Sequence, residues 1–187
     1  MAARVLYWAA LAIWAAVELH GSVALASDDR SQDRGTFTWT RRALLGGLVA
    51  VLVIDRVVPP MVPEDDQTVF LLVGAGLVAA GLGWRVWAIR TLGPFFTYQV
   101  ATRAEQPVID DGPYRWMSHP SYTGLLVACL GAGLGSANLA ILLVVTTGAM
   151  YGVVRRIRVE EAAMLQAMGE DYHRYLATRK RLLPGIW

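Results

Sequence analysis

Long apolar runs alternate with short polar connections along this chain. Five runs approach the roughly 20 residues that a helix needs to cross about 30 Å of membrane hydrocarbon. They cover residues 5–26, 43–60, 68–90, 122–137 and 138–156, and the last two meet at the tight sequence GLGSAN. The pattern predicts an all-α integral membrane bundle of about five transmembrane helices, formed by a single domain over residues 1–187.

The first run has two possible interpretations. Arg4 gives a basic start and residues 24–26 resemble a signal peptidase site, as in a cleaved signal peptide. Glu18 and His20 would interrupt the apolar core of such a signal, which favours a retained helix. Both are ionisable groups at membrane depth, and such groups are candidate site residues by default.

Composition and charge support the membrane interpretation and orient the bundle. The chain is 55% apolar and only 17% charged. Five spans place residues 28–42, the loop 91–121 and the C-terminal segment 157–187 on one side. With the flanks counted, fifteen of the 17 Lys and Arg residues lie on that side, and only Arg4 and Arg56 lie on the other. Cytoplasmic loops collect Lys and Arg, so the N-terminus is expected outside and the C-terminus in the cytoplasm.

Several classes of site are disfavoured. Cys129 is the only cysteine, and the three histidines are dispersed without an HExxH spacing, so we expect neither a disulfide nor a catalytic metal. No GxSxG or SxxK nucleophile pattern occurs. The glycines of the third and fourth runs do not follow a strand, as those of a phosphate-binding loop would. Gly131 with Gly135 forms a small-xxx-small pair that is typical of helix packing. We also expect no nucleic-acid partner.

The loop 91–121 carries the most distinctive polar sequence, GPYRWMSHPSYTG over residues 112–124. Pro120 suits the first position of a helix, so the fourth helix is expected to begin at 119–121. Its free N–H groups would favour an anion. His119 could contribute a titratable ligand there or merely cap the helix, and Tyr122 adds a hydroxyl one turn later.

Charged residues recur where the fifth run leaves the membrane. Arg156 and Glu160 share a helix face, whereas Glu161 is rotated away by roughly 100°. One carboxylate could reach the loop while the other pairs with Arg156, or the segment could be an ordinary solvated amphipathic helix. The helical pattern continues to Gly169, and a second short helix is expected before Pro184.

Four short motifs occur in a recognisable order: GPYRWMSHPSYTG, RIRVEEAAML, GEDYHRY and LLPGIW, preceded by LGPFFTYQV. In this order and spacing, residues 84–187 resemble the isoprenylcysteine carboxyl methyltransferases and their relatives among membrane phospholipid methyltransferases. The chain departs from the family pattern at Ser118, where the family has Arg before His-Pro. Arg115, one helical turn away, could supply that charge.

The resemblance implies an integral membrane enzyme that uses S-adenosylmethionine and releases S-adenosylhomocysteine. The cofactor pocket would be formed by the cytoplasmic loop and the C-terminal helices. By motif, Arg156 and Glu161 would lie nearest the reacting groups, as catalytic residues. The residues expected to bind the cofactor are Gly112, Tyr114, His119, Tyr122, Glu160, Tyr172 and Tyr175, the last two closing a lid.

The methyl acceptor would be the carboxylate of an isoprenylated cysteine or a similar lipophilic molecule that enters from the bilayer, among membrane lipids. Alternatives are methylation of nitrogen or sulfur in a phospholipid or small amphiphile, and a non-catalytic membrane module. The preference for Arg over Lys suggests a GC-rich bacterial genome and a bacterial inner membrane, where prenylated protein is an improbable substrate.

Overall fold

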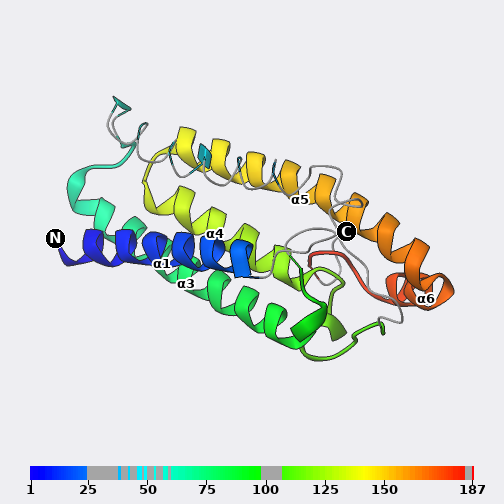
Figure 1. Cartoon of the computed structure of the whole chain (residues 1–187). Coiled ribbons are helices and arrows are strands. Elements are labelled where there is room, and N and C mark those ends of the chain that lie inside the picture. The colour runs from blue at the N-terminus through cyan, green and yellow to red at the C-terminus, as the bar shows by residue number, and fades with distance from the viewer. Residues whose placement is uncertain are drawn as a thin grey trace.

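The computed structural model describes residues 1–24, 60–97, 107–183 and 187, together with isolated positions between 38 and 58. Within this part the long helices are α1 (Ala2–Ala24), α3 (Glu64–Leu92), α4 (Pro120–Gly135) and α5 (Leu139–Met168). The shorter elements are the 3-10 turns η1 (Gly93–Phe95) and η2 (Gly112–Arg115) and the helix α6 (Glu170–Thr178). Figure 1 shows the long helices side by side, with α6 and the C-terminus at one end.

The helices confirm the predicted all-α membrane bundle in the part that the structure describes. Segments Ala2–Ser22, Asp65–Phe95 and Leu139–Met168 are long and apolar enough to cross a membrane. The helix α4 has 16 residues and is therefore only about 24 Å long, short of a full hydrocarbon thickness. Most of the expected span 43–60, and residues 98–106 of the loop, lie outside the described residues.

Small residues bring α3 and α4 into close contact, and this pair forms the most extensive helix interface described. A Cβ added to Gly74 would lie 2.5 Å from the Gly135 Cα, and one added to Gly131 would lie 2.7 Å from the Gly74 carbonyl oxygen. Further along, a Cβ on Gly81 would lie 2.5 Å from the Gly124 carbonyl oxygen. The glycine pattern therefore serves helix packing, as predicted.

The first helix is packed into the bundle. Tyr7, Leu11 and Trp14 are buried on one face of α1. The Tyr7 hydroxyl donates to the Ala132 carbonyl at 2.5 Å, and its ring fills the space where a Cβ of Gly135 would stand. Tyr7 therefore ties α1 to α4.

The connections at both ends of α5 follow from local sequence. Asn138 caps its start, because the Asn138 side chain accepts from the N–H groups of Ala140 and Ile141. At the other end Gly169 has φ +57°, and its N–H donates to the Leu165 carbonyl. The predicted stop at Gly169 is confirmed, and α6 follows at once.

Candidate active site

The His-Pro turn, residues 112–120, is held against α3 by close packing at its first residue. Gly112 begins η2 with φ +53°, and a Cβ there would lie 2.9 Å from the Thr91 hydroxyl and 3.5 Å from the Trp87 Nε1. Glycine alone combines this backbone conformation with so close an approach. His119 then precedes α4 as its N-cap residue, and Pro120 takes the first helical position, as predicted.

The C-terminal tail, which follows α6 from Arg179 onward, runs parallel to this turn at Lys180 and Arg181. The N–H of Ser118 donates to the Lys180 carbonyl at 2.8 Å, and the N–H of His119 donates to the Arg181 carbonyl at 2.9 Å. These bonds satisfy backbone donors just before α4 that would otherwise be buried without partners. The tail therefore fixes the path of the residues that carry His119.

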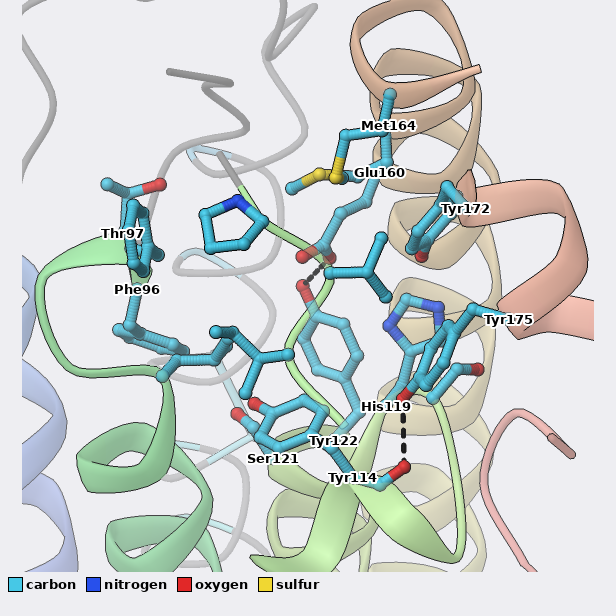
Figure 2. A pocket seen from close by; sticks show the side chains of 17 residues that line it. Phe96, Thr97, Tyr114, His119, Ser121, Tyr122, Glu160, Met164, Tyr172 and Tyr175 are labelled. Atoms are coloured by element: carbon cyan, nitrogen blue, oxygen red, sulfur yellow. Dashed lines mark hydrogen bonds between the residues drawn. The ribbon is translucent and has the colours of Figure 1, made fainter. Parts of the chain in front are cut away.

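A pocket opens between η1, the loop before η2, the start of α4, the end of α5 and α6. Figure 2 shows the side chains of Tyr114, His119, Tyr122, Glu160, Tyr172 and Tyr175 gathered around it. All six were predicted from the motifs to bind a cofactor. The remaining lining residues are mostly apolar: Leu92, Phe95, Phe96, Thr97, Pro107, Val108, Ile109, Ser118, Ser121, Met164 and Met168.

The Tyr122 hydroxyl joins two charged residues of α5. It donates to the Glu160 Oε2 at 2.7 Å and accepts from the Arg156 Nε at 2.7 Å. Figure 2 shows the bond to Glu160 at the pocket wall. Arg156 is buried, does not line the pocket and lies behind Tyr122. The spacing predicted that Arg156 and Glu160 share a helix face, and both side chains bind this one hydroxyl.

Glu161 lies behind His119, away from the pocket lining. Its carboxylate contacts the His119 Nε2 at 3.2 Å and binds the Arg181 guanidinium through both oxygens, with Nε at 2.9 and 3.1 Å and one terminal nitrogen at 2.9 Å. His119 and Glu161 are both buried. The His119 side chain makes no helix-capping bond, so its ring serves this contact instead.

The tyrosines around the pocket are protonated hydroxyls. Burial is the main cause that raises the pKa of Tyr114, Tyr172 and Tyr175 above the ordinary value. Glu160 raises the pKa of Tyr114 and Tyr172 further, and Asp110 does so for Tyr175. The Tyr175 hydroxyl donates to the carbonyl oxygens of Tyr114 at 3.0 Å and Met117 at 3.3 Å, so α6 is anchored on the turn.

Glu18 belongs to a structural network beneath the pocket. The Glu18 carboxylate accepts hydrogen bonds from the Arg85 Nε at 2.5 Å and from one terminal nitrogen of Arg85 at 3.0 Å. Arg85 also donates to the Ser121 hydroxyl at 2.7 Å. Ser121 lines the pocket, so α1 supports the site through α3. His20, the other membrane-depth candidate, is exposed.

The remaining sequence expectations have different outcomes. Gly112 faces Thr91 in α3 and does not line the pocket. Arg115 is exposed and is not among the residues that line the pocket. The cation beside His119 is Arg181, which comes from the tail and which the motifs did not single out. The bidentate contact with Glu161 depends on the path of the tail, which no sequence spacing reveals.

The pocket suits an organic ligand that combines an apolar or aromatic part with a positive charge. Tyrosine rings attract cations over their faces, and Glu160 supplies a carboxylate at the wall. Apolar walls with a few directed polar groups are the usual composition of small-molecule sites. S-adenosylmethionine has an aromatic base, a sulfonium and an ammonium group, and so fits this set of groups.

The chain matches one family over more than half its length. The family model described as phospholipid methyltransferase matches residues 69–171. That segment contains α4, α5 and nearly all of α3, including the His-Pro turn and the pocket residues of α5.

Similar curated proteins carry related names. A protein-S-isoprenylcysteine O-methyltransferase of Schizosaccharomyces pombe is 28% identical over 113 residues, 59% of this chain and 47% of the relative. One of Saccharomyces cerevisiae is 30% identical over 106 residues, 56% of this chain and 44% of the relative. A probable one of Oryza sativa subsp. indica is 30% identical over 127 residues, 66% of each chain. The chain therefore spans about half the length of the two yeast relatives.

A solved structure has a similar fold. A eukaryotic intramembrane Ras methyltransferase, isoprenylcysteine carboxyl methyltransferase, superposes with a TM-score of 0.60 and 21% identity. The match covers 78% of this chain and 52% of that chain. The likeness confirms the predicted membrane-bundle fold.

Proposed function

The chain belongs to the phospholipid methyltransferase family, as its motifs predicted, and on that premise we propose that it is an S-adenosylmethionine-dependent membrane methyltransferase. The favoured acceptor is the carboxylate of an isoprenylated cysteine or a similar lipophilic molecule. The main support is the pocket, which six residues from three separate motifs line together, among them the carboxylate of Glu160.

Different pocket residues would bind different parts of the cofactor. Glu160 would bind its ammonium group or ribose hydroxyls, and the rings of Tyr114, Tyr122 and Tyr172 would enclose the adenosyl and sulfonium parts. His119 and the start of α4 would add hydrogen bonds. When bound, S-adenosylmethionine supplies a methyl group on a positively charged sulfur.

Methyl transfer demands positioning above all. The C–S bond to the leaving thioether breaks as a bond to the acceptor oxygen forms, and the product is a methyl ester with S-adenosylhomocysteine. A carboxylate is already ionised at neutral pH and needs no base, so the chain contributes alignment and charge placement. Arg156 of α5 donates to the Tyr122 hydroxyl at the pocket wall and, through Tyr122, would orient the acceptor.

A family-level alternative acceptor is a phospholipid amine, as the description of the matching family suggests. An amine acceptor must lose a proton, and the Tyr122 hydroxyl on Glu160 offers a hydrogen-bonded route for it. A non-catalytic membrane module is the remaining interpretation.

The proposal is tested by transfer of a labelled methyl group from S-adenosylmethionine, with purified protein in detergent. The acceptors are N-acetyl-S-farnesylcysteine and, separately, extracted bacterial lipids. Label released as methanol by base indicates a carboxyl ester, the expected result. Base-stable label indicates transfer to nitrogen or sulfur and favours the alternative acceptor. No transfer, together with no binding of S-adenosylhomocysteine, would leave the non-catalytic module.

The chain is an integral membrane protein, and we propose a bacterial inner membrane with the pocket facing the cytoplasm. The cofactor would then enter from the cytosol and the acceptor from the bilayer. The basic residues collected on the side that carries the pocket support this orientation.

A further inference from the structure

Arg181 reaches His119 by two routes at once. Its backbone carbonyl accepts the His119 N–H at 2.9 Å. Its guanidinium holds both oxygens of Glu161, one of which contacts the His119 Nε2 at 3.2 Å. The Arg181 guanidinium also lies over the ring of Trp187, with 5.3 Å from its Cζ to the ring centre. Arg181 therefore fixes both the backbone position and the ring orientation of His119.

The contact constrains the protons of the imidazole. A guanidinium stays charged at ordinary pH, and a bidentate partner keeps the Glu161 carboxylate ionised, able only to accept. The ring nitrogen that faces it must therefore be a donor. Since the Glu161 side chain is 10% exposed and that of His119 only 5%, water competes little for this bond. In a neutral imidazole the other nitrogen then carries a lone pair.

We propose that Arg181 and Glu161 are positioning residues that hold His119 with its proton on Nε2, so that Nδ1 accepts a hydrogen bond from an amino or hydroxyl group of the cofactor. This assignment deepens the proposed function and rests on it for the identity of the ligand. It also gives Glu161 a different part from the one its motif implied: it acts through His119 instead of touching the reacting groups. The fixed tautomer is the same device that orients histidines by a carboxylate elsewhere in proteins.

The tautomer can be measured without any ligand. In protein labelled with ¹⁵N-histidine and held in detergent at pH 8.5, two-bond correlations separate the Nε2–H form, the Nδ1–H form and the imidazolium. A His119→Gln variant assigns the signal, and the exposed His20 and His173 serve as internal references. A single Nε2–H form at His119 is expected. The Nδ1–H form, a rapid mixture or an imidazolium would overturn the assignment.

A double-mutant cycle tests the route through which Arg181 acts. Arg181→Gln and His119→Ala should each weaken S-adenosylhomocysteine binding by about 10-fold, the loss of one charge-assisted hydrogen bond. Because both substitutions remove the same contact, the double variant should bind S-adenosylhomocysteine about as tightly as whichever single variant binds it less well. Arg181→Lys, which keeps the charge but loses the bidentate fork, should fall between the wild type and Arg181→Gln.

Additive losses in the cycle would overturn the positioning role, since they would mean that Arg181 acts independently of His119. The two experiments also separate this inference from the proposed function. If the wild type does not bind S-adenosylhomocysteine, the proposed function fails and with it the ligand named for Nδ1. The histidine spectra then still decide whether Arg181 and Glu161 hold the ring.

Discussion

At the scale of single residues, the Tyr122 hydroxyl is the point where α4 and α5 meet at the pocket wall. It bridges Glu160 and Arg156 with two bonds of 2.7 Å. Glu160 lines the pocket, whereas Arg156 is buried and does not line it. The sequence resemblance assigned Glu160 to the cofactor and Arg156 to the reacting groups, and both side chains bind the same hydroxyl.

Tyr122→Phe removes only this shared oxygen. We expect the variant to weaken S-adenosylhomocysteine binding by about 10-fold, since Glu160 loses the hydrogen bond that orients its carboxylate in the pocket. Isothermal titration calorimetry measures the change. Tyr151→Phe, which removes an exposed tyrosine hydroxyl from the neighbouring helix α5, is the control. Equal affinity for Tyr122→Phe and wild type would show that the bridge does not shape the pocket.

Arg156→Ala probes the second side of the same bridge. Its side chain does not line the pocket, so we expect the dissociation constant of S-adenosylhomocysteine to change about threefold or less. Turnover should fall at least 10-fold, because Tyr122 then no longer orients the acceptor. A larger loss in binding than in turnover would assign Arg156 to the cofactor instead of the acceptor. Steady-state methyl transfer and calorimetry on the same preparation separate the two effects.

Tyr175 gives a prediction on pH. Burial raises the pKa of Tyr175 above 10.0, the value expected for the unfolded chain. A raised pKa in the folded state contributes stability that is present below pH 10 and is lost as pH rises toward the folded value. Unfolding in detergent, followed by thermal melts from pH 8 to 11, should therefore show a steeper alkaline loss in the wild type than in Tyr175→Phe. The same alkaline loss of stability in the wild type and in Tyr175→Phe would contradict a raised pKa of Tyr175.

Six of the pocket residues could be predicted from sequence, because they lie in short motifs that resemble those of a known family. Arg181 and Arg85 could not, because their partners lie 20 and 67 positions away along the chain. Neither contact has a periodic or motif signal. Glu161 was found by its motif, but its partners were not, so its position behind His119 came only from the structure.

At the scale of elements, the interface between α3 and α4 positions the floor of the pocket. Gly81 and Gly124 lie on it, one turn before Arg85 and just after Tyr122. Backbone contact there leaves no space for a side chain. The distance between these two helices therefore sets how far the start of α4 stands from η1.

Gly81→Ala tests this contact. Its new Cβ would stand 2.5 Å from the Gly124 carbonyl oxygen, so we expect a loss of about 1–3 kcal/mol in the free energy of unfolding. Gly83→Ala on the same helix meets nothing within 4 Å and should be neutral or stabilising by up to about 1 kcal/mol, because alanine favours the helix. Thermal unfolding in detergent compares them. Equal effects would contradict the close packing.

Element boundaries could be predicted where local chemistry marks them. Pro120 marked the start of α4 and Gly169 the end of α5, and both are confirmed. Apolar runs alone marked the other ends less well. The helix α3 extends to Glu64 and Leu92, beyond the expected 68–90, because polar residues at a helix end lose nothing by remaining helical.

At the scale of the whole molecule, everything that forms the pocket lies at one end of the bundle, with α6 and the C-terminus (Figure 1). The end of α1 lies there too, because Glu18 pairs with Arg85. The sequence predicts that most basic residues lie on this side of the membrane. We therefore propose that cofactor entry, the tail and the positive charge share one membrane face.

Orientation is checked with reporter fusions in a bacterial host. Green fluorescent protein fused after Trp187 should be fluorescent, and alkaline phosphatase fused at the same point should be inactive, if the C-terminus is cytoplasmic as the positive charges predict. Active phosphatase and a dark fluorescent protein would place the pocket on the outer face, where the cytosolic cofactor is not available.

Calorimetric titration of the purified wild type with S-adenosylhomocysteine, beside Glu160→Gln, tests the central claim most directly. We expect saturable binding at one site per chain, weakened at least about 10-fold when Glu160 loses its charge. Asp171→Asn, at an exposed carboxylate on α6, is the control and should bind as the wild type does. A wild type that does not bind, or a Glu160→Gln variant that binds equally well, would contradict the assignment of this pocket to the cofactor.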